Sequence, residues 1–120
     1  MNIRLRPTGC CADPIAPTEL PGATRERWVA VFKALADPTR LDVLRLIAAQ
    51  AEPVCVCDVV ERADVSQPTI SHHLKVLREA GLVTVSRRGV WAYYTVDPRG
   101  VAVLDEAFDA LASASLAAAG

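Results

Sequence analysis

Aromatic residues are scarce in this chain: they make up 5% of its 120 residues. Many of the apolar residues are alanines, so the side chains available to fill a core are small for the length. The length fits one domain, and a hydrophobic content of 52% is sufficient to build a core. We therefore expect a single domain with a thin core, which favours a homodimer whose partner covers apolar surface.

Long hydrophobic runs are also missing. No segment approaches the roughly 20 apolar residues of a membrane-spanning helix, and the first residues, with Arg4, Arg6 and Pro7, lack the apolar run of a secretory signal. We expect a cytoplasmic protein with no membrane partner. In that compartment the four cysteines are expected to be free thiols or metal ligands rather than structural disulfides. Cys10 and Cys11 are adjacent, which places them poorly for bridging each other.

An excess of positive charge is absent, because the formal net charge is -1 at pH 7. This balance alone argues against a nucleic-acid partner, but the charge is unevenly distributed. Residues 66–90 carry four cations and one carboxylate, a net charge of +3, whereas residues 97–120 carry one cation and four carboxylates, a net charge of -3. A basic middle and an acidic end suit a protein that contacts phosphates with one surface only.

The first part of the chain divides into an arm and a helix. Residues 1–23 contain proline and glycine without periodicity, and we expect them to form an irregular arm that carries Cys10 and Cys11. The folded domain is expected over residues 24–120. Its first helix is predicted from Thr24 to Ala36, because four apolar residues recur at helical spacing: Trp28, Val31, Phe32 and Leu35.

Two further helices are predicted before residue 64. The first runs over residues 38–50, with Asp37 as its N-cap and a periodic stripe at Leu41, Leu44, Arg45 and Ala48. Pro53 ends any continuation, and residues 55–63 have room for a two-turn helix. A break at residues 64–66 then precedes another helix. A short helix, a tight turn and a capped second helix form a helix-turn-helix unit.

The second helix of this unit is predicted from Ser66 to Leu82. Ser66 can cap its start, and Gly81 supplies the left-handed stop. At about 100° per residue its apolar side chains share one side, with His73 at the edge; these are Ile70, Leu74 and Leu77. The opposite side is polar and partly basic, which favours a helix that reads DNA.

After this helix the residues become β-branched and aromatic. Strands are predicted over residues 82–86 and 90–96, joined by a turn with two arginines at its tip: Arg87, Arg88 and Gly89. A last helix is predicted over residues 98–118, with a seam for packing another helix at Val101, Leu104, Phe108, Leu111 and Ser115. The expected fold class is mainly α with a β-hairpin, a winged helix-turn-helix.

Three motifs follow one another in a characteristic order. They are Lys33 to Arg40 (KALADPTR), Cys55 to Asp58 (CVCD) and Ser66 to Lys75 (SQPTISHHLK). Together they resemble the ArsR (arsenic-responsive) family of bacterial metalloregulatory repressors, and the match covers residues 24–97. The resemblance implies a homodimer, joined by its first and last helices, that binds a palindromic operator until a thiophilic ion releases it.

The partner in this interpretation is double-stranded operator DNA. Towards the major groove we expect Gln67, Thr69, Ser71 and His72, towards phosphates Lys75 and Arg78, and towards the flanking minor groove or backbone Arg87 and Arg88. A two-fold dimer matches two half-sites on DNA. Dimer contacts are expected at Trp28, Val31, Phe32, Leu35, Val101, Leu104, Phe108 and Leu111.

Two cysteine pairs, Cys10 with Cys11 and Cys55 with Cys57, are the predicted ligands of the inducing ion. Soft thiolates favour arsenic, antimony, cadmium, lead or zinc over calcium or magnesium. The resemblance implies that Cys55 and Cys57, at the start of the short helix, bind the inducer. Many arsenic sensors of the family have a third cysteine three residues further on, where this chain has Val60. We therefore expect the remaining sulfur to come from Cys10 or Cys11 on the arm.

Two ligand sets stay open. As(III) or Sb(III) takes three thiolates, from Cys10, Cys11 and either Cys55 or Cys57, whereas Cd(II), Pb(II) or Zn(II) would take all four. The cadmium and lead sensors that resemble this pattern separate their arm cysteines, and two adjacent sulfurs fit an open pyramid with less strain than a tetrahedron. We favour arsenic. The last helix has no histidine, so the family's carboxylate-histidine zinc site is not expected there.

Other interpretations predict different behaviour. The cysteines could be buried structural residues, or thiols that answer to oxidation in a DNA-binding protein. His72 and His73 diverge by about 100° on a helix and make a poor ligand pair, so we assign His72 to DNA and His73 to packing. Cysteine enzymes usually use a phosphate-type loop or a Cys-x-x-Cys motif, and the sequence has neither. We therefore expect no enzyme.

Overall fold

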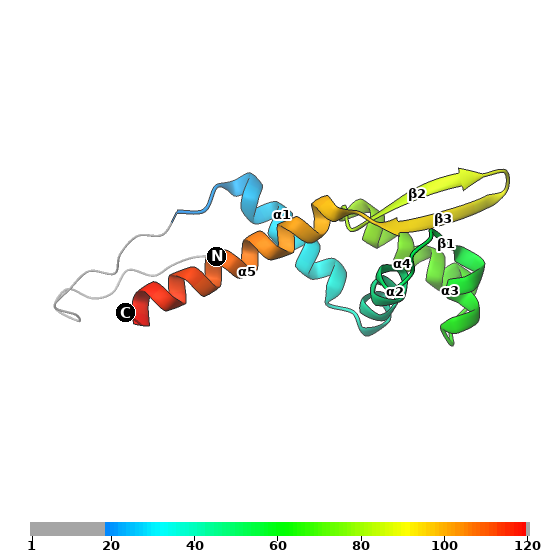
Figure 1. The fold of residues 1–120 in the computed structure, drawn as a ribbon, viewed down its shortest axis with the longest axis horizontal. Coiled ribbons are helices and arrows are strands. Elements are labelled where there is room, and N and C mark those ends of the chain that lie inside the picture. The colour runs from blue at the N-terminus through cyan, green and yellow to red at the C-terminus, as the bar shows by residue number, and fades with distance from the viewer. Residues whose placement is uncertain (1–18, 120) are drawn as a thin grey trace.

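The computed structural model describes residues 19–119, which form the helices and strands labelled in Figure 1. The helices are α1 (Gly22–Leu35), α2 (Pro38–Ala48), α3 (Val56–Arg62), α4 (Gln67–Glu79) and α5 (Pro98–Ala119). The strands are β1 (Val54–Cys55), β2 (Val83–Arg88) and β3 (Trp91–Val96). α1 and α5 pack together at one end, and the β2–β3 hairpin projects at the other, with α2, α3 and α4 beneath it (Figure 1). The predicted fold class, a winged helix-turn-helix, is confirmed.

Local signals set the starts of the helices. Asp37 precedes α2, and its Oδ2 accepts from the backbone N–H of Arg40 at 2.9 Å, which holds the pKa of Asp37 below its ordinary value. Ser66 caps α4 in the same way, its Oγ accepting from the backbone N–H of Thr69 at 3.4 Å. Proline stands in the first turn of both helices, where no backbone donor is needed. Both predicted caps are confirmed.

Helix α4 ends in a Schellman motif. Gly81 has a φ of +80°, its N–H donates to the Arg78 carbonyl at 3.0 Å, and the N–H of Leu82 donates to the Leu77 carbonyl at 3.0 Å. The left-handed glycine turns the chain, so that Leu82 is fully buried at the start of the wing. Gly81 therefore stops the helix by the predicted mechanism, although α4 ends at Glu79 and not at the predicted Leu82.

The sheet has one more strand than the two predicted. β1 pairs with β3 through Val54 opposite Tyr94 and Cys55 opposite Tyr93, so the strand order is β1-β3-β2. All pairs are antiparallel. β1 is only two residues long, which is too short to show an alternating pattern in sequence. Because β1 pairs with β3 and ends at Cys55, the chain enters α3 directly from the sheet.

The wing's turn also differs from its prediction. β2 continues through Arg88, which pairs with Trp91, so the turn consists of Gly89 and Val90. Gly89 has a φ of +64°, as the first residue of a two-residue type II′ hairpin requires. Arg87 and Arg88 were predicted at the tip and instead lie in the last two positions of a strand, because the glycine must occupy the turn.

The core lies where α2, α3 and α4 meet the base of the sheet. Its largest fully buried side chains are Val59, Ile70, Leu74, Leu77, Leu82 and Val83. On α2 the predicted stripe was wrong in part: Val43, Leu44 and Ile47 are buried, whereas Leu41 and Arg45 are exposed. The predicted and the observed stripe both have helical spacing, and the position of α4 selects between them.

None of the helices in residues 19–119 has the length and hydropathy that a membrane-spanning segment needs.

Candidate functional site

Helix α4 presents a polar face opposite its buried face. Ile70, Leu74 and Leu77 have no exposed surface and fix the orientation of the helix. The predicted DNA-contacting side chains of this helix are all exposed: Gln67, Thr69, Ser71, His72, Lys75 and Arg78. The hydroxyl of Thr69 is 2.9 Å from that of Ser66, so part of its hydrogen-bonding capacity serves the cap. The face offers amide, hydroxyl and imidazole groups followed by two cations, which matches base edges flanked by phosphates.

The wing carries two exposed cations. Arg87 and Arg88 are exposed near the end of β2. The guanidinium of Arg88 lies over the ring of Tyr93, 5.1 Å from its centroid, in a cation–π contact. Tyr93 is in turn the β3 residue that pairs with Cys55 of β1. Arg88 is thus held against the sheet that also carries the first cysteine of the CVCD motif.

The two cysteines of that motif converge. Cys55 ends β1 and is the N-cap of α3, whereas Cys57 lies in the first turn of α3. The Cys57 thiol donates to the sulfur of Cys55, with the two Sγ atoms 2.7 Å apart. Cys55 is buried and Cys57 is exposed, and both are free thiols. The hydrogen bond to Cys55, with burial and the nearby acidic groups, raises the pKa of the Cys57 thiol.

The two sulfurs alone do not form a metal site within the described residues. Two convergent sulfurs are the donors that soft ions prefer. Within residues 19–119, however, no group of three or more His, Cys, Asp or Glu side chains could hold a metal ion. Val60, three residues after Cys57, is half-buried on α3 and offers no sulfur. Cys10 and Cys11, the predicted additional ligands, lie outside the described residues.

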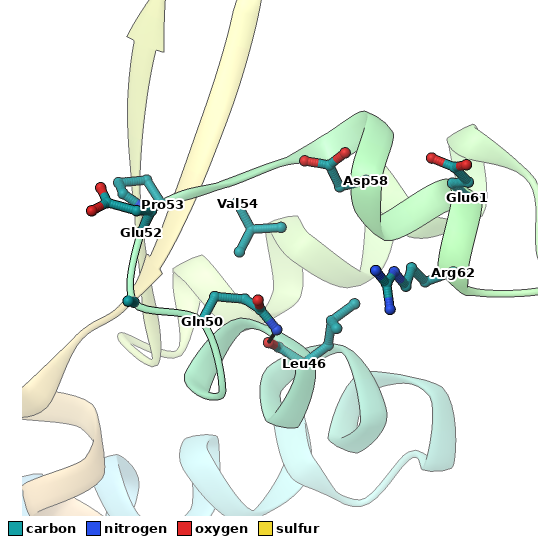
Figure 2. A pocket seen from close by; sticks show the side chains of 9 residues that line it. Leu46, Gln50, Glu52, Pro53, Val54, Asp58, Glu61 and Arg62 are labelled. Atoms are coloured by element: carbon teal, nitrogen blue, oxygen red, sulfur yellow. Dashed lines mark hydrogen bonds between the residues drawn. The ribbon is translucent and has the colours of Figure 1, made fainter.

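A solvent-filled groove of about 800 Å³ lies beside α3, between the end of α2 and β1 (Figure 2). Its lining includes the carboxylates of Glu52, Asp58 and Glu61 and the guanidinium of Arg62. Neither cysteine of the motif lines it. The groove offers oxygen rather than sulfur donors, so it does not extend the thiol pair into a soft-metal site.

Apolar side chains gather on α1 and α5. The rings of Phe32 and Phe108 meet edge to face, 5.9 Å between centroids and at 71°. Of the eight residues predicted at the dimer interface, four are exposed, namely Phe32, Val101, Phe108 and Leu111, and three are half-buried, namely Trp28, Leu35 and Leu104. Val31 is buried in the chain's own core, at 2% exposure, so little of it remains for a partner. The Trp28 indole N–H is buried and has no acceptor among the described residues.

Sequence reasoning gave no role to Arg40, which is the most connected side chain near α4. Its guanidinium contacts two backbone carbonyls of α1 and the ring of His73. His73, predicted as a packing residue, is half-buried and turned towards α2. Arg40 ends the KALADPTR motif and lies three residues after a helix cap, but neither signal reveals a contact 33 residues away.

These features together define a winged helix-turn-helix transcriptional regulator. The chain matches the family described as "Bacterial regulatory protein, arsR family" over residues 37–85. It is 40% identical over 84 residues to the arsenical resistance operon repressor of Escherichia coli, covering 67% of this chain and 71% of that one. It is also 38% identical over 76 residues to a cadmium resistance transcriptional regulatory protein (CadC homolog) of Staphylococcus aureus, covering 63% and 62%.

A solved structure agrees with these relatives. The homodimeric winged helix-turn-helix DNA-binding domain of a possible ArsR-family regulator from Mycobacterium bovis superposes with a TM-score of 0.61 at 30% identity, covering 78% of this chain and 85% of that one. The chain belongs to the ArsR family of transcriptional repressors. As predicted, these relatives are DNA-binding regulators and not enzymes.

Proposed function

We propose that this repressor binds operator DNA as a homodimer and is released when arsenite, or the chemically similar antimonite, binds its cysteine thiolates. The observation that carries the proposal is the thiol pair at the start of α3. The Sγ atoms of Cys55 and Cys57 are 2.7 Å apart, and α3 packs directly against α4. A change at the thiols therefore acts on the neighbour of the helix that presents the polar face.

DNA binding is assigned to α4 and the wing. Gln67, Thr69, Ser71 and His72 face the major groove, Lys75 and Arg78 contact phosphates, and Arg87 and Arg88 contact the flanking minor groove or backbone. The exposure of all eight side chains and the net charge of +3 over residues 66–90 support this assignment. Phosphate contacts set orientation and affinity, while base edges supply sequence preference.

Dimerisation is assigned to α1 and α5. Phe32, Val101, Phe108 and Leu111 expose apolar surface there, and Trp28, Leu35 and Leu104 are half-buried beside them. An apolar patch on two packed helices is stabilised when a second copy covers it. The homodimeric state of the Mycobacterium bovis domain supports the same arrangement. A two-fold dimer then presents two α4 helices to two half-sites.

The inducer site is assigned to Cys55 and Cys57 together with Cys10 and Cys11, which precede α1 in the sequence. A trivalent arsenic or antimony ion supplies a soft centre for three thiolates. The description of the Escherichia coli relative as an arsenical resistance repressor supports this choice. Four thiolates would instead suit Cd(II), Pb(II) or Zn(II), and the cadmium regulator among the relatives supports that second candidate.

Release follows from linkage between the two sites. An ion that binds more tightly to the DNA-free conformation must weaken DNA binding by the same factor, typically ~5- to 150-fold. Cys55 is tied to the wing through β3, and Cys57 belongs to the helix packed on α4. Drawing the arm onto these thiols would shift α3 relative to both DNA-contacting elements.

The test uses a Cys55→Ser, Cys57→Ser double variant, with Cys57→Ser alone beside it, because Cys57 is exposed and its replacement leaves the core intact. A labelled duplex of the promoter upstream of the repressor's own gene is bound and then titrated with arsenite. We expect wild-type protein to release the duplex and the double variant to bind it without release, since either cysteine of the pair could complete a three-thiolate site. Cys55→Ser and the Cys10→Ser, Cys11→Ser pair are assayed in parallel. Arsenite-triggered release that survives in the Cys55→Ser, Cys57→Ser double variant would refute the site.

The same titration with antimonite, cadmium, lead, zinc and peroxide separates the alternatives. Release by cadmium or lead with all four cysteines required would favour the four-thiolate site. Release by peroxide with loss of free thiols would identify a redox sensor. Arsenite should protect three thiols per chain from a thiol reagent and form no disulfide.

A further inference from the structure

Arg40 joins three helices at one point. It lies in the first turn of α2, where its Nε donates to the Ala34 carbonyl at 2.7 Å and its Nη2 to the Lys33 carbonyl at 3.4 Å. Both carbonyls belong to the last turn of α1. Its Nη1 lies 3.3 Å from Nδ1 of His73 on α4. One guanidinium therefore links α1, α2 and α4.

The chemistry of the two side chains fixes the role of each. Arginine carries only N–H donors, so Nδ1 of His73 must accept, and the neutral imidazole with its proton on Nε2 is the form that does so. The Lys33 carbonyl also accepts from the backbone N–H of Ala36 at 3.3 Å. Carbonyls at the end of a helix can accept from cationic side chains, and a cation beside them interacts favourably with the helix dipole. Two contacts of Arg40 thus stabilise the end of α1, and the third ties that end to α4.

The bridge connects surfaces with different tasks. α1 carries exposed apolar side chains such as Phe32, which we assign to the dimer. α4 carries the polar face assigned to DNA, and His73 lies on its half-buried edge next to the exposed His72. A dimer meets two half-sites about 34–36 Å apart only when both reading helices hold a set angle to the dimer axis. The Arg40–His73 contact lies between α1, which we assign to the dimer interface, and α4, which we assign to DNA.

We propose that Arg40 is a positioning residue for operator recognition, holding α4 through His73 at a fixed angle to α1. The proposal rests on the DNA-binding part of the proposed function and is independent of the inducer site. Arg45 provides a matched control on the same helix, because it is an exposed arginine that pairs with Asp42 of α2 at 3.5 Å. Its loss removes the same charge without touching α4.

The test is a double-mutant cycle in the full-length protein, with Arg40→Gln, His73→Leu, both together, and Arg45→Gln as the control. Affinity is measured by fluorescence anisotropy on the promoter duplex and on an unrelated duplex of equal length. Sedimentation and thermal melts report dimerisation and folding. We expect each single variant to lose about tenfold in promoter affinity and the double variant to lose no more than either, since a hydrogen bond with a charged donor is worth about that factor.

Conservative variants separate positioning from folding. Arg40→Lys keeps the charge but not the planar fork, so it should behave like Arg40→Gln in promoter binding. His73→Asn keeps an acceptor near the position of Nδ1 and should restore most of the affinity that His73→Leu loses. On the unrelated duplex, Arg40→Gln and Arg45→Gln should lose affinity equally, because each removes one positive charge.

Three results would overturn the proposal: additive losses in the double variant, equal losses on promoter and unrelated DNA, or a lowered melting temperature with unchanged promoter affinity. In the last case Arg40 would only stabilise the end of α1. A wild-type protein that does not distinguish its promoter from the unrelated duplex would instead refute the proposed DNA-binding function.

Discussion

Gly100 packs against the backbone that ends α4, and its replacement by alanine gives a sharp prediction. A Cβ at position 100 would meet the carbonyl group of Gly81, with the carbonyl carbon at 2.8 Å, and the Cα of Leu82 at 2.9 Å. These atoms are backbone, so no side-chain rotation relieves the contact. Gly100 is the third residue of α5, and its absent side chain lets this helix start directly over the turn after α4.

Two opposing terms decide the sign of Gly100→Ala. Alanine is the better helix former by roughly 0.5–1 kcal/mol, which would stabilise an unconstrained position. Crowding in a packed interior costs about 1–3 kcal/mol, and the contacts here are with atoms that can move only if α4 or α5 moves. The clash wins. We expect a net destabilisation of ~1–2 kcal/mol, which lowers the melting temperature by about 4–8 °C for a domain of this size.

Thermal unfolding followed by circular dichroism measures this effect, with the protomer concentration held constant because dimerisation shifts the melting temperature. Gly22→Ala is the matched control, since a Cβ at position 22 meets nothing within 4 Å among the described residues and α1 begins there. The control should melt at or slightly above the wild-type temperature. A melting temperature that rises in Gly100→Ala would refute the packing argument.

Three other substitutions test single contacts. The side-chain hydrogen bonds from Arg99, and after them its backbone N–H, hold the pKa of Asp97 below its ordinary value. The ionised carboxylate therefore stabilises the fold fully above about pH 4, and this stabilisation is lost as the pH falls through the lowered pKa. Asp97→Asn should therefore melt below wild type at pH 7, and a gap that fails to narrow in acid would contradict this. Lys75→Gln should reduce the slope of log affinity against log salt by about 0.9, and an unchanged slope would mean that Lys75 contacts no phosphate. Ser66→Ala removes the oxygen that accepts from the Thr69 N–H at the start of α4, and should lower the free energy of unfolding in urea by ~1 kcal/mol. Ser66→Asp keeps an acceptor and should not lower it. Equal losses in the two variants would exclude capping.

The helix-turn-helix could be predicted because its signals are local. Ser66 and Gly81 act within one turn of α4, and the spacing of Ile70, Leu74 and Leu77 defines its buried face without reference to any other element. The order of helices and strands, the caps and the winged architecture follow from interactions of this range. The resemblance to the ArsR family rests on the same segments, which is why family and fold class were predicted together.

Contacts between distant segments could not be predicted in this way. β1 exists because two residues meet β3 almost 40 positions later, and the buried stripe of α2 depends on where α4 lies. Arg88 entered a strand because only Gly89 suits the positive φ of the turn. In each case several local patterns were acceptable, and packing selected one.

The thiol pair shows the division most clearly. The sequence by itself determined that the chain has four cysteines and that Cys55 and Cys57 are two positions apart at the start of a short helix. On a regular helix such side chains do not face each other. Only the tertiary structure, by ending β1 at Cys55 and starting α3 at the next residue, turns the two sulfurs together. The packing of α2 against α4 likewise brings Arg40 to His73. No local pattern in either helix predicts this contact, because the two residues are 33 positions apart.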